Sequence, residues 1–179
     1  GDDATFTKCV VRSANSDGVF IRGRYATVSK STFRGCYSGI TIEGLGAAVI
    51  RNRVTNMDDR GIEIDGDDAE VSKNTVKVIE DGNGIDVDGD RTLVSRNTVV
   101  NTDEDCITVQ GNDAAIVRNR CMASGDSCID VSGRGATVEK NTASMSDSAV
   151  MEVSGDNFRI VGNKLSLAVD DADGMDISS

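Results

Sequence analysis

Three consecutive acidic residues, Asp103, Glu104 and Asp105, stand immediately before Cys106 and a run in which apolar and polar residues alternate. Two carboxyl groups are the usual catalytic equipment of a glycoside hydrolase, where one protonates the leaving group and the other attacks or activates water. A group of carboxylates also suits Ca²⁺, which takes several oxygen ligands. A solvated polar loop is the third interpretation. The choice depends on the elements that position these residues.

Composition narrows the possible functions. The 179 residues suffice for one domain with a buried core, and they include no His, the commonest general base and zinc ligand. The formal net charge of −11 argues against a nucleic-acid partner, and no apolar run is long enough for membrane insertion. The charge is uneven, because residues 1–60 carry nine Lys/Arg against six Asp/Glu and the remainder carries ten against twenty-four.

An internal repeat organises the whole chain. Its six-residue unit begins at steps of 21 to 24 residues, as "GVFIRG" at Gly18, "GITIEG" at Gly39, "GIEIDG" at Gly61, "GIDVDG" at Gly84, "CITVQG" at Cys106, "CIDVSG" at Cys128, "VMEVSG" at Val150 and "GMDISS" at Gly174. A second pattern follows each unit and carries Asn at positions 52, 74, 97, 119, 141 and 163, with Ser31 and Cys9 in the earlier slots.

The apolar period within each unit is two, which predicts strands. One repeat holds about three short strands, with the patterns "IxVxG", "AxV" and "VxN", and a return to the same pattern after ~22 residues is one coil of a solenoid. Each strand then pairs in parallel with its copy in the next coil, about 4.8 Å away. We expect inward residues such as Ile62 and Ile64 to stack as ladders. The Asn row is expected in a turn, because Asn tolerates a left-handed conformation and stacked amides can hydrogen-bond along the axis.

The "GIxVxG…AxVxxNxV" coil resembles the right-handed parallel β-helix repeat of the pectin-lyase-like superfamily, over essentially the whole chain. The resemblance implies that "IxVxG" forms the first sheet, that Asn lies in the second turn, and that the loop before each Gly is the third turn. We therefore predict an all-β, right-handed, single-stranded parallel β-helix of seven to eight coils with three short sheets, as one domain over residues 1–179. This scaffold serves lyases, hydrolases, epimerases, adhesins and spacers, so the fold does not fix the function.

In that superfamily the substrate groove runs along the outer face of the first sheet, walled by the third-turn loops. The outward positions and the loops of this chain form an acidic wall. Phe20, Tyr25 and Tyr37, with Arg22 and Arg24, cluster near the first full coils, and they are predicted either to form a sugar-stacking platform or to cover the sheet edge. The predicted substrate-binding residues are Phe20, Arg22, Tyr37, Glu63, Asp86 and Asp130.

One stretch is similar to a more specific family. "DEDCITVQG" resembles the "DDC" coil of polygalacturonase-type glycoside hydrolases, and this resemblance makes Glu104 and Asp105 the catalytic pair. The chain departs from that family, because Asn83 stands in place of an Asp, Ser127 in place of a His, and "VMEV" in place of an Arg-x-Lys signature. A lyase, hydrolase or epimerase acting on an acidic polysaccharide is therefore an alternative function.

Calcium is the second interpretation of the acidic wall. Carboxylates stacked on a rigid sheet, together with loop carbonyls, supply the several oxygen ligands that Ca²⁺ requires. The predicted ligands are Asp81, Asp86, Asp88, Asp103, Asp105 and Asp130. A solvated face that keeps the sheet edges soluble remains the simplest alternative.

Two further features have mainly structural interpretations. Basic residues flank the Asn slots and form a stripe, which is either a solvated rim or a path for an anionic glycan: Lys30, Arg51, Arg53, Lys73, Arg96, Arg118, Arg120 and Lys140. Cys106 and Cys128 share one repeat position, and because their side chains would run parallel we expect buried free thiols rather than a disulfide.

These observations predict an extracellular or cell-surface domain that interacts with a polysaccharide or other glycan through an acidic, calcium-binding groove. A carbohydrate-active enzyme and a purely structural solenoid are the alternatives. Solenoids need capped ends, and no amphipathic helix is present at either terminus. We therefore expect a segment of a longer β-helix, or end-to-end self-association.

Overall fold

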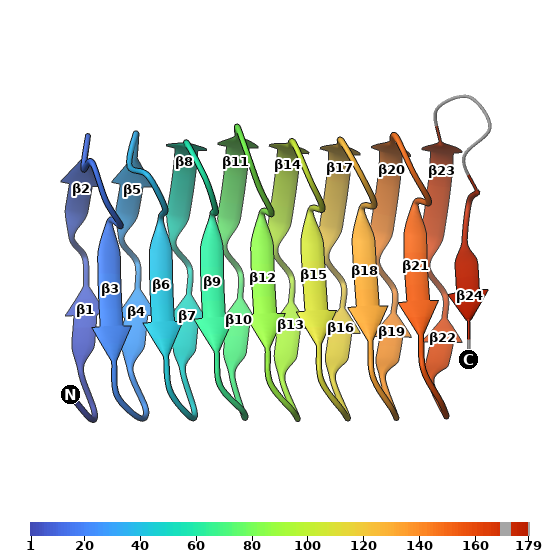
Figure 1. The fold of residues 1–179 in the computed structure, drawn as a ribbon, viewed down its shortest axis with the longest axis horizontal. Helices are drawn as coiled ribbons and strands as arrows, with labels where there is room; N and C mark the ends of the chain where they lie inside the picture. Colours follow the sequence, from blue (N-terminus) through green and yellow to red (C-terminus); the bar gives the residue numbers. More distant parts are fainter. Residues whose placement is uncertain (169–172, 179) are drawn as a thin grey trace.

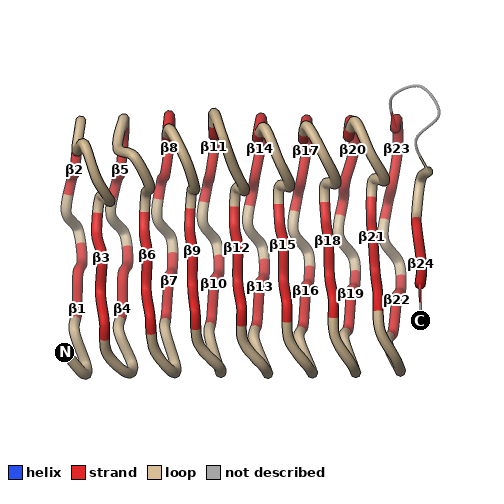
Figure 2. The backbone as a smooth tube through the Cα atoms, in the orientation of Figure 1, coloured by secondary structure: helices blue, strands red, loops and turns tan. Residues whose placement is uncertain are grey.

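In the computed structural model the chain winds into a right-handed parallel β-solenoid of about eight turns, and the structure describes residues 1–168 and 173–178 (Figure 1). Each turn contributes one strand to each of three parallel sheets (Figure 2). No described residue lies in a helix, so none forms a helix that could cross a bilayer. The predicted fold class is confirmed.

The first sheet contains the "IxVxG" strands β3 (Val19–Arg22), β6 (Ile40–Glu43), β9 (Ile62–Asp65), β12 (Ile85–Asp88), β15 (Ile107–Gln110), β18 (Ile129–Ser132), β21 (Met151–Ser154) and β24 (Asp176–Ser178). The second sheet contains β1 (Thr5–Thr7), β4 (Thr27–Ser29), β7 (Ala48–Ile50), β10 (Glu70–Ser72), β13 (Leu93–Ser95), β16 (Ala115–Val117), β19 (Thr137–Glu139) and β22 (Arg159–Val161). The third sheet follows the Asn turn and contains β2 (Val10–Arg12), β5 (Thr32–Arg34), β8 (Arg53–Met57), β11 (Thr75–Ile79), β14 (Thr98–Thr102), β17 (Arg120–Ser124), β20 (Thr142–Ser146) and β23 (Lys164–Ala168).

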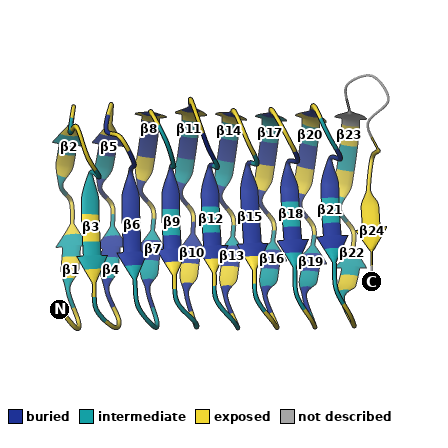
Figure 3. Ribbon diagram, viewed as in Figure 1, coloured by how far each residue is buried: buried dark blue, intermediate teal, exposed yellow. Residues whose placement is uncertain are grey.

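The repeat fixes the register between neighbouring coils. Ile62 pairs with Ile40 on one side and with Ile85 on the other, and the residues two positions further along pair in the same way. The inward residues of the first-sheet strands from β6 to β21 are at most 1% exposed and form part of the core (Figure 3). Outward residues alternate with them, so every polar position of the first sheet faces the same outer surface.

The second turn is held by a ladder of asparagines, as predicted. The main-chain N–H of Asn52 donates to Oδ1 of Asn74, and Asn74 donates in the same way to Asn97, at 2.8 and 2.9 Å. Each side-chain amide also donates to a carbonyl of the preceding coil, as Asn74 does to Val49 at 2.8 Å. The ladder satisfies buried polar groups that would otherwise be costly inside the turn.

The backbone of this turn corrects one expectation. The left-handed conformation belongs to the residue before each slot of the ladder, not to the Asn. That residue is basic, with φ between 52° and 59°, at Lys30 (before Ser31), Arg51, Lys73, Arg96, Arg118 and Lys140, and it is Gly162, with φ of 65°, before Asn163. The physical reason is the ladder: the amide must point along the solenoid axis, so the preceding residue takes the turn conformation and projects its side chain into solvent.

The glycine that follows each first-sheet strand from β3 to β21 is explained by the coil spacing. Gly66 has a φ of 156°, and a Cβ there would lie 2.4 Å from the carbonyl oxygen of Gly44 in the neighbouring coil. Coils separated by about 4.8 Å leave no room for a side chain at this corner.

Candidate functional site

The outer face of the first sheet is acidic. Its outward positions carry the carboxylates of Glu43, Glu63, Asp65, Asp86, Asp88, Asp130, Glu152 and Asp176. Arg22 is the one basic residue in these described strands. Third-turn residues border this face and add Asp17, Asp59, Arg60, Asp105 and Asp126.

A hollow of about 320 Å³ lies at the N-terminal end of this face. Phe20, Tyr37 and Glu63, three of the predicted substrate-binding residues, line it together. The two aromatic side chains are 45% and 50% exposed, so their rings are available to a ligand. The Arg22 guanidinium lies 4.8 Å from the centre of the Phe20 ring and pairs with both carboxylate oxygens of Glu43, at 2.6 and 3.0 Å.

The Thr41 hydroxyl also lines this hollow. Thr41 is 8% exposed, and its Oγ1 makes no hydrogen bond of normal geometry with any described residue. Asp17 lies close by: burial raises the pKa of its carboxyl, and the Thr41 hydroxyl offsets part of that rise. This nearly buried hydroxyl and the Asp17 carboxyl both line the hollow, where they offer hydrogen-bonding points to a ligand.

A second hollow of about 220 Å³ continues along the sheet and shares Glu63 and Asp65 with the first. It adds Asp86, Asp88 and Gln110. Together the two hollows form a groove from β3 to β15.

Arg60 stands in the wall of this groove. Its guanidinium contacts Glu63 Oε1 at 3.0 Å and Asp86 Oδ2 at 3.5 Å. Burial raises the pKa of both carboxyls, and Arg60 offsets part of the rise. The groove therefore keeps an excess of negative charge.

Asp105 lies deeper than Glu104. Its Oδ1 accepts the main-chain N–H of Ser127 at 2.8 Å, and its Oδ2 accepts the Thr108 hydroxyl at 2.9 Å. The Asp105 N–H in turn donates to Oδ1 of Asn83 at 2.9 Å. Asn83, Asp105 and Ser127 thus form a short ladder, to which Asn83 contributes its side-chain oxygen and Ser127 its main-chain N–H. The ladder gives Asn83, which departs from the hydrolase pattern, a structural role.

The neighbours of Asp105 are other acids of the same outer face, beyond the two hollows. Burial, together with the charges of Asp126 and Asp130, raises the pKa of Asp105 to about 6. Burial and the charges of Glu152 and Asp126 raise the pKa of Asp130 to about 6 as well. Glu104 is exposed and its N–H contacts the Gly82 carbonyl, so the structure sets Asp130 rather than Glu104 beside Asp105. The catalytic role of Glu104 and Asp105 stays a prediction.

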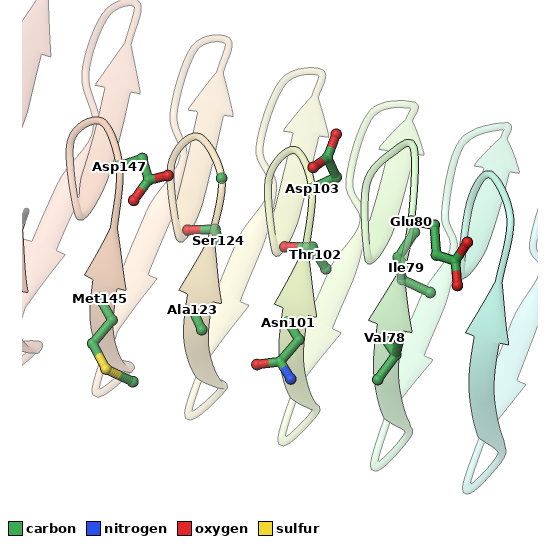
Figure 4. Close-up of a pocket in the computed structure, with 11 residues that line it drawn as sticks. Val78, Ile79, Glu80, Asn101, Thr102, Asp103, Ala123, Ser124, Met145 and Asp147 are labelled. Carbon is green, nitrogen blue, oxygen red and sulfur yellow. The ribbon is translucent and has the colours of Figure 1, made fainter.

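The six predicted calcium ligands do not surround one point. Asp86 and Asp88 line the smaller hollow, Asp105 and Asp130 are neighbours, and Asp81 is exposed in a third turn. Asp103 lines a different hollow of about 520 Å³ beside the third sheet, together with Glu80 and Asp147 (Figure 4). Among residues 1–168 and 173–178, no three acidic or thiol side chains converge as they would around a metal ion. Calcium binding stays a prediction.

The predicted substrate-binding set lacks Asp17 and Thr41, which line the larger hollow of the groove. Thr41 pairs in register with Glu63, so its outward position follows from the repeat. Asp17 occupies the repeat position of Asp105, and alignment of the third turns would have found it.

The cysteines are not part of the groove. All five are free thiols, which confirms the prediction for Cys106 and Cys128. The neighbouring thiol of Cys121, together with burial, raises the pKa of Cys106 to about 12, so this thiol stays protonated.

Comparisons with known proteins agree with this architecture. The Dettilon tailspike protein superimposes with a TM-score of 0.59 and 17% identity, covering 90% of this chain and 42% of its own. The periplasmic alginate epimerase AlgG superimposes with a TM-score of 0.64 and 16% identity, and the match covers 93% of this chain and 43% of the epimerase chain. A double mutant of that epimerase superimposes with a TM-score of 0.64 and 10% identity, and the match covers 92% of this chain and 54% of the epimerase chain. The chain thus spans about half the length of these proteins, and the similarity shows the fold.

No curated protein sequence matches the chain. The family described as "Right handed beta helix region" matches residues 1–121. This stretch covers well over half of the chain and contains all the residues that line the two hollows of the groove. The protein therefore belongs to the right-handed β-helix family.

Proposed function

We propose that this protein is a glycan-binding β-helix domain whose ligand lies along the outer face of the first sheet. One observation carries the proposal: the exposed rings of Phe20 and Tyr37 stand beside a polar hollow that contains the nearly buried hydroxyl of Thr41 and the carboxyl of Asp17. An apolar ring face combined with a few placed polar groups is the usual composition of a small-molecule site, and it matches a sugar, which has apolar and hydroxyl-bearing surfaces.

The shape of the groove favours a linear ligand. Its two hollows share Glu63 and Asp65 and follow the sheet from coil to coil. The strands that carry these residues are fixed on both sides by parallel pairing. A ligand would therefore meet a preorganised surface and little ordering entropy would oppose binding.

The charge of the groove indicates the class of glycan. Arg22 and Arg60 are its basic residues, and both are already paired with carboxylates. A uronic acid polymer would be repelled by the remaining carboxylates unless a divalent cation came with it. We therefore propose a neutral or amine-bearing glycan as the ligand, with an acidic glycan only in the presence of Ca²⁺.

The relatives support a location outside the cytoplasm. One is named a tailspike protein and another a periplasmic alginate epimerase, and the second name states a location outside the cytoplasm. We propose the same environment for this chain.

A binding screen over neutral, amine-bearing and uronic oligosaccharides, each with and without Ca²⁺, tests the proposal. Phe20→Ala/Tyr37→Ala should weaken binding about tenfold or more, which is the loss expected for two aromatic contacts. Tyr25→Ala is the matched control, because Tyr25 is 55% exposed and does not line the hollow. Absence of binding to every class, or equal losses in the two variants, would contradict the proposal.

A carbohydrate-active enzyme is the second candidate function. Asp105 and Asp130 are partly buried, neighbouring carboxyls on adjacent coils, and such pairs perform acid–base and nucleophilic steps on glycosidic bonds. A screen for reducing ends and unsaturated products over the same saccharides tests it. Asp130→Asn should abolish turnover while binding persists, whereas turnover retained in that variant would exclude this pair.

A further inference from the structure

The third sheet has the opposite charge to the first. Its described strands contain no Asp or Glu, and their basic residues are Arg12, Arg34, Arg53, Lys77, Arg120 and Lys164. In a chain with a net charge of −11, this segregation gives the molecule one acidic and one basic face.

Four of these cations gather around one hollow. It has a volume of about 370 Å³ and is lined by Arg12, Thr32, Arg34, Arg53, Thr55, Asn56, Lys77 and Val78. These residues come from β2, β5, β8 and β11, which lie side by side at the N-terminal end of the solenoid (Figure 1). No acidic residue lines this hollow.

Strand register explains why the four cations converge. Arg12 on β2 pairs in register with Arg34 on β5. The same register position is occupied by Thr55 on β8 and by Lys77 on β11, so these four residues form one row across the strands. Arg53 pairs with Thr32 in the adjacent row. The four side chains therefore span four coils, about 14 Å, on one flat surface.

These cations have no acidic partners. Arg12, Arg34, Arg53 and Lys77 form no salt bridge with another described residue, although other arginines of the chain do. Like charges held at coil spacing repel one another, and an anionic ligand would relieve that repulsion. The left-handed turn residues Lys30, Arg51 and Lys73 project next to the starts of β5, β8 and β11 and extend the basic surface.

We propose that the basic hollow on the third sheet binds a linear anionic polysaccharide, through its sulfate or carboxylate groups. Guanidinium groups pair with both anions in a two-pronged geometry, and the Thr and Asn side chains of the hollow supply hydrogen bonds for sugar hydroxyls. A nucleic acid fits less well, because no aromatic side chain lines the hollow to stack a base. This site is separate from the first-sheet groove and does not depend on the function proposed for it.

The test measures binding of dextran sulfate, polygalacturonate, neutral dextran and a single-stranded thymidine oligomer, at low and at high NaCl. Dextran sulfate or polygalacturonate should bind, and affinity should fall as salt rises, because screening weakens contacts between exposed charges. Neutral dextran should not bind at this surface. Failure of both anionic polysaccharides would overturn the proposal.

Two triple variants distinguish binding at the basic hollow from non-specific attraction to positive charge elsewhere on the protein. Arg12→Gln/Arg34→Gln/Arg53→Gln should weaken polysaccharide binding about tenfold, as expected for the loss of three exposed ionic contacts. Arg24→Gln/Arg91→Gln/Arg134→Gln removes the same charge from exposed arginines outside the third sheet and should leave the affinity unchanged. Equal losses in the two variants would overturn the proposal, and melting curves check that both fold.

Two further measurements test the class of ligand and whether the basic hollow binds independently of the first-sheet groove. If the thymidine oligomer binds as tightly and with the same dependence on the three arginines, the assignment to a polysaccharide is wrong. Phe20→Ala/Tyr37→Ala should leave anionic polysaccharide binding intact, so failure of the first-sheet proposal and failure of this one give different results.

Discussion

The side-chain oxygen of Asn97 accepts two hydrogen bonds from Asn74, one from its main-chain N–H at 2.9 Å and one from its side-chain amide at 3.1 Å. The Asn97 amide itself donates to the Val71 carbonyl at 2.9 Å. Because Asn97 is 1% exposed, water cannot replace these bonds if the side chain is removed.

Asn97→Ala should therefore lower the free energy of unfolding by about 2–4 kcal/mol, since it leaves buried groups of Asn74 and Val71 without partners. Urea denaturation measures the loss. Asn112→Ala is the control: Asn112 also bridges two coils, to Asp90 and Arg134, but it is exposed. If Asn112→Ala lowers the free energy of unfolding as much as Asn97→Ala does, burial of the Asn97 hydrogen bonds is not the cause of the loss.

Much of the fold was predictable because each structural position recurs in every coil. The Asn row and the inward ladder of Ile62 and Ile85 needed only the repeat period and the apolar alternation. The conformation of the turn was not predictable in the same way, because the pattern does not show whether Lys73 or Asn74 takes the left-handed backbone.

The candidate site was predictable only in part. The sequence placed Asp103 and Asp105 in one acidic cluster, but the third turn directs them to different surfaces. Side-chain direction in a turn depends on backbone angles that vary from residue to residue, unlike the regular alternation of a strand. The hollow at Phe20 and Thr41 depends on contacts between three coils, which no single repeat displays.

The pH dependence of stability follows from Asp105. Its pKa in the folded state, about 6, lies above the value near 3.9 of an unfolded chain. The folded state therefore binds the proton more tightly, so the contribution of Asp105 to stability falls as pH rises from about 4 to about 6, and the penalty is complete above pH 6.

Asp105→Asn should remove this penalty while its amide oxygen still accepts from Ser127. At pH 7.5 the Tm should rise by about 2–4 °C, the shift that about 1 kcal/mol produces in a domain of this size. The gain should fall close to zero at about pH 3, where the wild-type carboxyl is largely protonated in both states. Calorimetry at the two pH values measures it, and a gain that did not change with pH would contradict the stated cause. Asp103→Asn is the control: Asp103 is exposed, so this substitution should leave the Tm unchanged at both pH values.

Calcium binding makes a separate prediction. Asp65, Asp86 and Asp88 line one hollow with Gln110, and their oxygens are of the kind that Ca²⁺ prefers. Millimolar Ca²⁺ should raise the Tm by mass action on the folded state, and Mg²⁺ should do so much less because it releases its water reluctantly. Asp88→Asn should remove most of the gain, whereas Asp147→Asn, on the hollow beside the third sheet, should not. An equal Tm rise with NaCl at matched ionic strength would show simple screening instead.

The ends of the solenoid carry the last prediction. β3 pairs only with β6, and β24 only with β21, so each end of the first sheet presents an open strand edge among the described residues. Val10 and Ile177, on the outermost strands, are 61% and 50% exposed. Open edges with exposed apolar residues favour pairing with another chain. Residues 1–60 and the remainder have net charges of opposite sign, which favours head-to-tail contact.

Sedimentation velocity of residues 1–179 should therefore show association that grows with concentration and weakens with salt. Val10→Lys should reduce it, because a charge on an edge strand blocks pairing with another chain. Leu93→Lys is the matched control, since Leu93 is 38% exposed on β13, in the middle of the second sheet, and should have no effect. A monomer at every concentration would contradict end-to-end association, and an equal effect of the two lysines would place the contact elsewhere than at the ends.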